Sequence, residues 1–264
     1  MKKSFNYKKI LLGVCLLCLA LYATAGVHGK GKYVSYEQNN LPAFSSVHVQ
    51  AQADVTFMQS STTHVQISGP ENLVKVTRVF VQADTLYVTF TTPLRVRGKE
   101  EVKVAVYAPQ LNTATVEGRG ILSVHGMLSM EKLSVLLYGQ GKFSADGLMA
   151  NILQVHAQDN SEAELNRIRA KNVTAQATGQ AEIELSGIAN RISLYNEGAG
   201  EIEAADLRAP SGEAVLKGRG NIYIAAFENL KASAYGKGKI YYKGSPVSMQ
   251  REGNIVHVVQ DYDD

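Results

Sequence analysis

The sequence predicts an all-β protein: a single-stranded parallel β-helix of about seven coils, with a less regular N-terminal β region as its cap. Two observations support this prediction. Apolar and polar residues alternate over long stretches. A Gly-x-Gly phrase also recurs about every 20 residues, and a fixed period of this length is the signature of a repeat protein. The phrase begins at Gly118, Gly139, Gly198, Gly218 and Gly236, with degenerate copies at Asp159 and Gly179.

The first 25 residues are typical of a secretory signal peptide. Four lysines without an acid precede the apolar run 10–22, and Ala-Thr-Ala at 23–25 is a small-x-small cleavage site. A lipoprotein signal is the alternative, but Val14 and Leu17, which precede Cys15 and Cys18, are larger than the residue that a lipobox requires. Removal of residues 1–25 would leave an exported chain that has no cysteine and therefore no disulfide.

Removal of the signal also changes the charge balance. The whole chain has 27 basic and 24 acidic residues, and four of the basic residues lie in the first 25. The remaining chain is therefore slightly acidic, which argues against nucleic acid as a partner. No second apolar stretch approaches the roughly 20 residues of a membrane-spanning helix, so we expect no transmembrane segment in the mature chain.

Residues 26–43 are expected to be a polar leader, and 44–110 an irregular β region. The stretches FSSVHVQAQADVTFMQ and EEVKVAVYAP alternate like strands, but they lack the period of the Gly-x-Gly phrases. We expect this region to cover the first coil, because the open end of a coil stack would otherwise pair with other chains.

Residues 111–246 are predicted to form the repeat coils. Each coil would have two strands and a return segment whose apolar side chains face one interior, and coils would stack in parallel about 4.8 Å apart. Three inward columns follow the glycines: Leu122, Phe143, Ala163, Ile183, Ile202, Ile222 and Ile240; then Val124, Ala145, Leu165, Leu185, Ala204, Ile224 and Tyr242; then Leu128, Leu148, Ile168, Ile188, Leu207 and Phe227.

The glycines are expected at the corners between strands, where a positive φ or a missing Cβ is useful. They do not form a dinucleotide-binding fingerprint, because the third glycine of G-x-G-x-x-G is missing and a strand follows. A final strand is expected within 247–260, an acidic tail at 261–264, and a single domain over 44–260. The predicted structural turns contain Gly118, Gly120, Gly139, Gly141, Gly198, Gly200, Gly218, Gly220, Gly236 and Gly238.

The run of G-x-G-[polar]-Ile phrases, which ends in GKGKIYYKGSP and follows FSSVHVQAQADVTFMQ, resembles the head GIN domain family. Members of this family are exported bacterial β proteins labelled autotransporter adhesins. The resemblance covers roughly residues 44–246. It implies a β-helical fold and a location in the bacterial cell envelope, in the periplasm or on the outer surface, and it supplies no catalytic residues.

The residues predict no catalytic site and no cofactor. The sequence contains no H-E-x-x-H or G-x-S-x-G motif, and the regular period leaves little room for the long loops that wall the grooves of β-helical polysaccharide lyases and hydrolases. We therefore predict a non-enzymatic binding or adhesion-type module for an envelope glycan, protein or surface, with a polysaccharide lyase or hydrolase as the alternative. The histidines are scattered: His28, His48, His64, His125, His156 and His257.

Tyrosines form one candidate binding surface. Tyr138, Tyr223, Tyr235 and Tyr241 would face outward and offer rings on which sugars stack, whereas Tyr242 falls in an inward column. We favour the simpler interpretation that tyrosine is common in strands.

Acidic residues form the second candidate surface, at the outward positions that follow the turns of three successive coils. Stacked carboxylates repel one another, and weakly bound calcium or a basic partner would relieve the repulsion. The favoured interpretation is a solvated face, as for most charge runs. The two ladders consist of Glu162, Glu164, Glu182, Glu184, Glu201 and Glu203.

Overall fold

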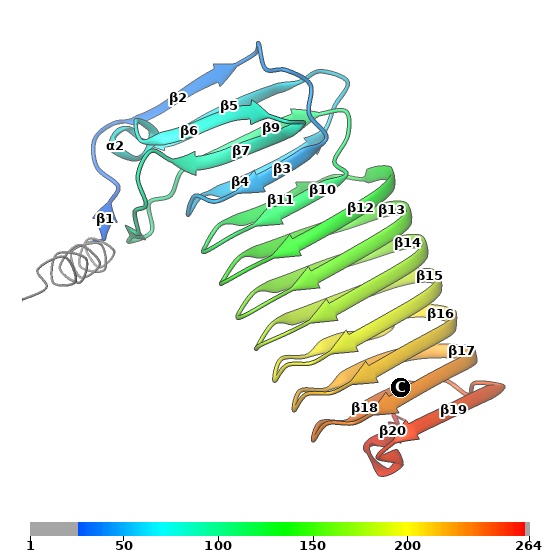
Figure 1. Ribbon diagram of the computed structural model, residues 1–264. Helices are drawn as coiled ribbons and strands as arrows, with labels where there is room; N and C mark the ends of the chain where they lie inside the picture. The colour runs from blue at the N-terminus through cyan, green and yellow to red at the C-terminus, as the bar shows by residue number, and fades with distance from the viewer. Residues whose placement is uncertain (1–25, 262–264) are drawn as a thin grey trace, which may run out of the picture.

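The structure, a computed structural model, describes residues 26–261. The predicted signal peptide and residues 262–264 of the predicted tail lie outside the described residues. Within them the chain forms a β-solenoid of about seven turns, which confirms the predicted fold class. The coils stack along one axis from an N-terminal cap to a smaller C-terminal cap (Figure 1).

The solenoid strands pair in parallel, each with the strand one coil further along the chain. Ile183, Ile202 and Ile222 lie directly opposite one another and are almost fully buried, as the period predicts. The strands are β10 (Thr113–Val116), β11 (Ile121–His125), β12 (Leu128–Leu137), β13 (Lys142–Ala157), β14 (Glu162–Ala177), β15 (Glu182–Asn196), β16 (Ile202–Leu216), β17 (Ile222–Ala234) and β18 (Ile240–Lys243).

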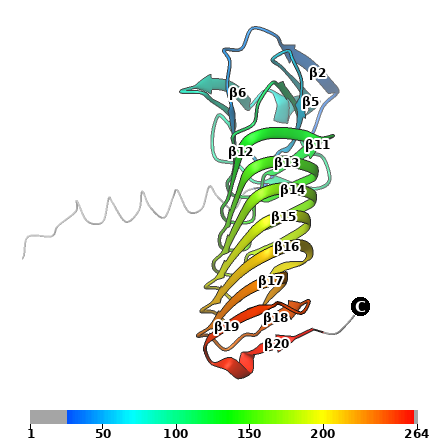
Figure 2. The same ribbon diagram turned by 90° about the vertical axis from the view of Figure 1, so that its right-hand side faces the viewer.

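Two sides of the solenoid differ in how the chain reverses direction. On one side the glycine turns join consecutive strands. On the other side the long strands curve without a break, and Figure 2 turns this side toward the viewer. We call it the return edge, and it comprises residues 127–132, 147–152, 167–172, 187–191, 206–211 and 225–229.

The third predicted inward column is wrong at two positions on the return edge. Ile188 is 59% exposed and Phe227 is 38% exposed. The pairing register shifts before each of them, so that Gly187 lies opposite Ile168 and Ala226 takes the buried position. The column is confirmed at its other members, Leu128, Leu148, Ile168 and Leu207, all of which are buried.

The glycine turns have two different geometries. In the early turns the first residue has a positive φ: +71° at Gly118, +74° at Gly139 and +65° at Asp159. In the later turns a side chain is excluded by the close approach of the preceding coil: a Cβ added to Gly220 would lie 1.6 Å from the carbonyl oxygen of Gly200. The later glycines are therefore needed because backbone from the preceding coil occupies the space of a side chain.

A buried asparagine marks the change of turn geometry. Asn196 occupies an inward position that is apolar in neighbouring coils, and its side chain is completely buried. Its Nδ2 donates to the carbonyl oxygens of Gly200 (2.8 Å) and Asn221 (3.1 Å), and its Oδ1 accepts from the Gly198 amide (2.8 Å). These bonds satisfy the polar group and tie two successive late turns together.

The N-terminal cap begins with a regular coil. Strands β3 (Ser46–Val49) and β4 (Asp54–Gln59) stack in parallel on β10 and β11, although this coil has no Gly-x-Gly phrase. Strands β7 (Thr85–Phe90) and β9 (Lys103–Ala108) add a second parallel layer.

The outermost strands of the N-terminal cap run antiparallel, which ends the parallel stack. Strand β5 pairs with β9, β2 with β5, and β6 with β7. The predicted polar leader therefore contributes strand β2 to the cap. The remaining elements are β1 (Val27–His28), β2 (Tyr33–Gln38), β5 (His64–Pro70), α2 (Glu71–Val74), β6 (Thr77–Gln82) and β8 (Val96–Arg97).

At the other end, the predicted final strand within 247–260 divides into β19 (Ser248–Gly253), a short 3-10 turn (Ile255–His257) and β20 (Val258–Gln260). Tyr242 closes the interior and is 4% exposed, as predicted for its column. Its hydroxyl accepts a hydrogen bond from Arg251 (2.9 Å) and donates one to Gln260. Across residues 26–261, no helix has the length and hydropathy required to span a bilayer.

Candidate functional site

The structure brings all six predicted glutamates together on one face. Glu162 lies opposite Glu182, and Glu164, Glu184 and Glu203 lie opposite one another in the next row. The backbone of Glu201 bonds to Ala181, which extends the first row to the third coil. The six side chains line a shallow hollow of about 290 Å³, and we call this surface the acidic face.

The alternation of the strands explains why these side chains point outward. Between the glutamates of each coil lies a buried residue, Ala163, Ile183 or Ile202, and each is at most 1% exposed. Because successive side chains of a strand point to opposite sides, burial of these residues directs the carboxylates into solvent.

Different side chains close the two ends of the rows. At the N-terminal end Lys142 lies opposite Glu162 and forms an ion pair with it. At the C-terminal end Tyr223 lies opposite Glu203, and Tyr241 lies opposite Tyr223. The two rings stack with centroids 4.8 Å apart and an interplanar angle of 11°. The acidic face is therefore bounded by a cation at one end and by an aromatic pair at the other.

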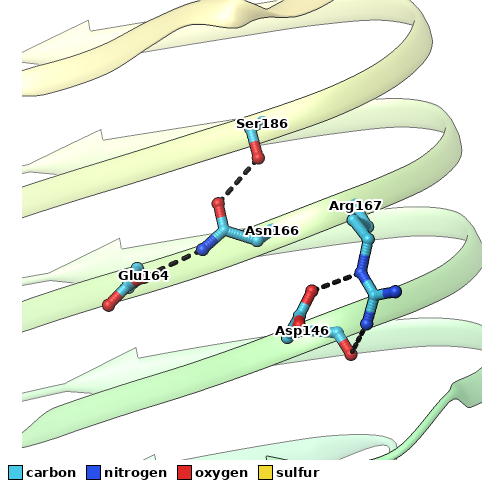
Figure 3. A network of polar contacts seen from close by, with 5 residues as sticks. All are labelled: Asp146, Glu164, Asn166, Arg167 and Ser186. Carbon is cyan, nitrogen blue, oxygen red and sulfur yellow. Dashed lines mark hydrogen bonds and ion pairs between the residues drawn. The ribbon is translucent and has the colours of Figure 1, made fainter.

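A polar network holds one carboxylate at the border of the face (Figure 3). Asn166 donates a hydrogen bond to Glu164 (2.8 Å) and accepts one from the Ser186 hydroxyl (2.7 Å). The neighbouring Arg167, at a positive φ of 52°, pairs with Asp146. These contacts fix the edge of the face.

Three carboxylates of the acidic face have no such partner. Within the described part of the chain, the side chains of Glu182, Glu184 and Glu201 form no hydrogen bond and no ion pair. Burial raises the pKa of Glu203, and the hydrogen bond from the Ala205 amide offsets part of this increase. The charges of Glu201 and Asp206 raise the pKa by smaller amounts. Negative charge is thus concentrated at the centre of the face.

The geometry does not support the calcium hypothesis. Among residues 26–261, no three histidine, cysteine, aspartate or glutamate side chains are close enough to hold a metal ion. Parallel rows present their carboxylates side by side and do not converge them on one point, whereas calcium takes six to eight oxygen ligands. A basic partner, the other ligand predicted for this face, can pair with the carboxylates one by one and does not need them to converge.

The other predicted candidates are not brought together. Tyr235 and Tyr138, 57% and 39% exposed, lie beside glycine turns far apart along the stack. In the N-terminal cap, the Nε2 of His48 lies 3.1 Å from a carboxylate oxygen of Glu117, and His64 stacks on a tyrosine ring. The histidines therefore do not form a common site.

The sequence interpretation named Tyr223 and Tyr241 as outward tyrosines but did not connect them with the acidic face, and it missed Lys142. Lys142 precedes Glu162 by one coil length, and Tyr223 follows Glu203 by one coil length. The signal was present in the sequence, because the repeat period connects each of these residues to its neighbour in the row.

The family model described as "Putative auto-transporter adhesin, head GIN domain" matches residues 43–246 of this chain. The chain belongs to this family. The match confirms the resemblance to the head GIN domain that the sequence phrases indicate. None of the curated proteins compared with the chain matches it.

Several solved structures share the fold of this chain. A "putative adhesin" from Parabacteroides distasonis has a TM-score of 0.81 at 21% identity, and covers 89% of this chain and 99% of its own. A "putative lipid binding protein" from the same species has a TM-score of 0.79 at 21% identity, with 90% and 100% covered. A "putative adhesin" from Bacteroides fragilis has a TM-score of 0.63 at 25% identity, with 89% and 99% covered.

Proposed function

We propose that this head GIN domain is a non-enzymatic, adhesion-type module of the bacterial cell envelope that binds a basic segment of a partner protein through its acidic face. The observation that carries the proposal is that six carboxylates line one hollow while three of them have no partner in the described chain. An amino-bearing envelope glycan is the other candidate for the same face.

Electrostatics favours a cationic ligand. Carboxylates about 5 Å apart repel by about 0.8 kcal/mol per neighbour in water and about 3 kcal/mol at an effective dielectric constant of 20. Burial of each Ile or Leu behind the rows contributes about 1.5 to 3 kcal/mol, so the fold tolerates this repulsion. A bound guanidinium or ammonium group would remove it, and this relief adds to the affinity for a basic ligand.

The stacked Tyr223 and Tyr241 rings favour arginine among basic side chains. Arginine forms planar, bidentate pairs with carboxylates and also stacks on aromatic rings. The row of Glu164, Glu184 and Glu203 ends directly at the tyrosine pair, so one short arginine-containing segment can contact both.

The adhesin family supports export to the envelope, and the lysine-led apolar segment at residues 1–25 supports a cleaved signal peptide as the route. The choice between periplasm and outer surface is left to localisation experiments. The alternative of a polysaccharide lyase or hydrolase gains no support from the family or from the named structural neighbours.

The test is titration with a hexa-arginine peptide, followed by capture of partners from the cell envelope. The variant replaces Glu182, Glu184, Glu201 and Glu203 by Gln. It should neither bind the hexa-arginine peptide nor capture envelope partners. A control variant removes the same charge at four exposed positions off the face: Glu37, Glu100, Glu131 and Glu228. Equal loss in both variants would contradict a specific acidic face, and release of new reducing ends or unsaturated products from acidic glycans would favour the enzyme.

A further inference from the structure

One outward row of the return edge alternates between apolar and cationic side chains. In this row Met149 lies opposite Arg169, Arg169 opposite Ile188, and Ile188 opposite Arg208. The alternation runs along the solenoid axis from coil to coil, so it appears only when residues at the same position of successive coils are compared.

Apolar side chains are unusually exposed on this edge. Single exposed apolar residues are ordinary, but a group on one surface of a soluble domain marks an interaction site. Two of these residues, Ile188 and Phe227, are the ones that the repeat period places in the core and that the register shifts turn outward. The exposed fractions are 58% for Met127, 46% for Met149, 39% for Ile152, 59% for Ile188 and 38% for Phe227.

The cations of the return edge are available for a ligand. Within the described chain none of the five forms an ion pair, and the Arg208 guanidinium lies 5.3 Å from the centre of the Phe227 ring. A sixth cation, Arg167, is already paired with Asp146. The five are Lys132, Arg169, Lys171, Arg191 and Arg208, and the acids in the same ranges are Glu131, Asp206 and Glu228.

We propose that the return edge docks on a membrane surface that carries anionic lipid. Basic residues interspersed with exposed apolar ones are the composition of interfacial membrane contacts: the apolar side chains enter the headgroup boundary and the cations contact lipid phosphates. The rows run along the stack, so the solenoid lies with its axis parallel to the membrane. This surface is separate from the acidic face and has the opposite chemistry, and it goes beyond the adhesion function proposed above.

A second basic cluster shows why a lipid surface fits the return edge better than a soluble polyanion. Lys217, Arg219 and Lys237 line a hollow of about 660 Å³ beside the glycine turns. This turn cluster has three cations against one acid, Glu197, but the rest of its lining is mostly glycine, and Tyr235 is the one large ring among the lining residues. The five exposed apolar side chains distinguish the return edge from it.

The turn cluster also supplies the matched control for sedimentation with vesicles. The chain from residue 26, which includes the solenoid and both caps, should bind phosphatidylglycerol-containing vesicles and not pure phosphatidylcholine vesicles. Each cation removed should lower partitioning roughly fivefold, so Arg169→Gln, Arg191→Gln and Arg208→Gln together lower it by about two orders of magnitude. Lys217→Gln, Arg219→Gln and Lys237→Gln remove the same charge and should leave it within about twofold.

A fluorescence reporter tests insertion directly, since the chain has no tryptophan. Ile188→Trp should show a blue-shifted emission with anionic vesicles, and Tyr235→Trp in the turn cluster should not. Equal losses in the two triple variants, a shift at both reporters or at neither, or binding to dextran sulfate without binding to vesicles would each overturn the proposal. The return-edge variant should still bind hexa-arginine, so the outcome is independent of the acidic face.

Discussion

The glycine turns allow a stability prediction that compares the same substitution, glycine to alanine, in a late turn at Gly220 and in an early turn at Gly118. An alanine Cβ at Gly220 would lie 1.6 Å from the carbonyl oxygen of Gly200 and 2.7 Å from its carbon. At Gly118 an alanine Cβ would meet nothing within 4 Å, and only the φ of +71° opposes it. The pair therefore separates close approach between coils from backbone conformation.

The expected magnitudes follow from these contacts. Gly220→Ala must push the turn away from the preceding coil, where the amides of Arg219 and Gly220 bond to the Gly198 carbonyl at 2.8 and 3.1 Å. Two weakened hydrogen bonds at about 1 kcal/mol each, with about 1 to 3 kcal/mol of overpacking, give a loss of about 3 to 5 kcal/mol. Gly118→Ala should cost about 1 to 2 kcal/mol, the penalty for an L-residue in the left-handed region.

The assay is thermal unfolding followed by hydrogen exchange. In a domain of this size each kcal/mol lowers the Tm by about 2 to 4 °C, so Gly220→Ala should lower it by about 6 to 20 °C and Gly118→Ala by about 2 to 8 °C. Each coil contacts only its neighbours, so exchange in Gly220→Ala should rise mainly between residues 198 and 260. If the two variants were equally stable, close approach of the coils would not be the reason for the late glycines.

Three further predictions address the acidic face and the C-terminal cap. Because the pKa of Glu203 is raised in the folded state, its ionised form destabilises the fold above that pKa, and the destabilisation is absent at a pH where the folded and unfolded states are both protonated. Glu203→Gln should therefore raise the Tm at pH 7 and leave it unchanged near pH 3, as a melting series across pH would show. Millimolar calcium should leave the Tm unchanged, because the carboxylates do not converge, and a clear increase would contradict that geometry. Tyr242→Ala should cost about 3 to 5 kcal/mol by opening the interior, and Tyr242→Phe about 1 kcal/mol for the lost hydrogen bonds, as measured by denaturant unfolding.

The sequence predicts the fold and the acidic face because both depend on fixed offsets from the turns. Alternation places Ile183 inside and Glu182 outside whatever the rest of the coil does. The two failures, Ile188 and Phe227, lie in the coils that start at 179 and 218, which are the two shortest coils of the repeat. A coil that is shorter than its neighbours must shift its pairing register at some position, and the repeat period alone does not predict that position.

Other features escaped prediction for physical reasons of their own. The coil of β3 and β4 lacks Gly-x-Gly, so nothing in the repeat connects it to the stack that it joins. The change of turn geometry at Asn196 depends on how closely neighbouring coils approach, and this distance has no counterpart in the sequence pattern. The identity of a partner depends on a second molecule, whose chemistry the acidic face restricts only to cations.

The arrangement of two unlike caps around nearly identical coils has a consequence for the family as a whole. The antiparallel strands at one end pair with one another and with β7 and β9, and the Tyr242 closure at the other end bonds to Arg251 and Gln260 of the C-terminal cap. Gain or loss of one whole coil in the middle would leave both caps intact and change the length of the stack by about 4.8 Å. Such a change would also lengthen or shorten every row of outward residues by one residue, so the number of coils sets the length of the surface that the solenoid presents to a partner.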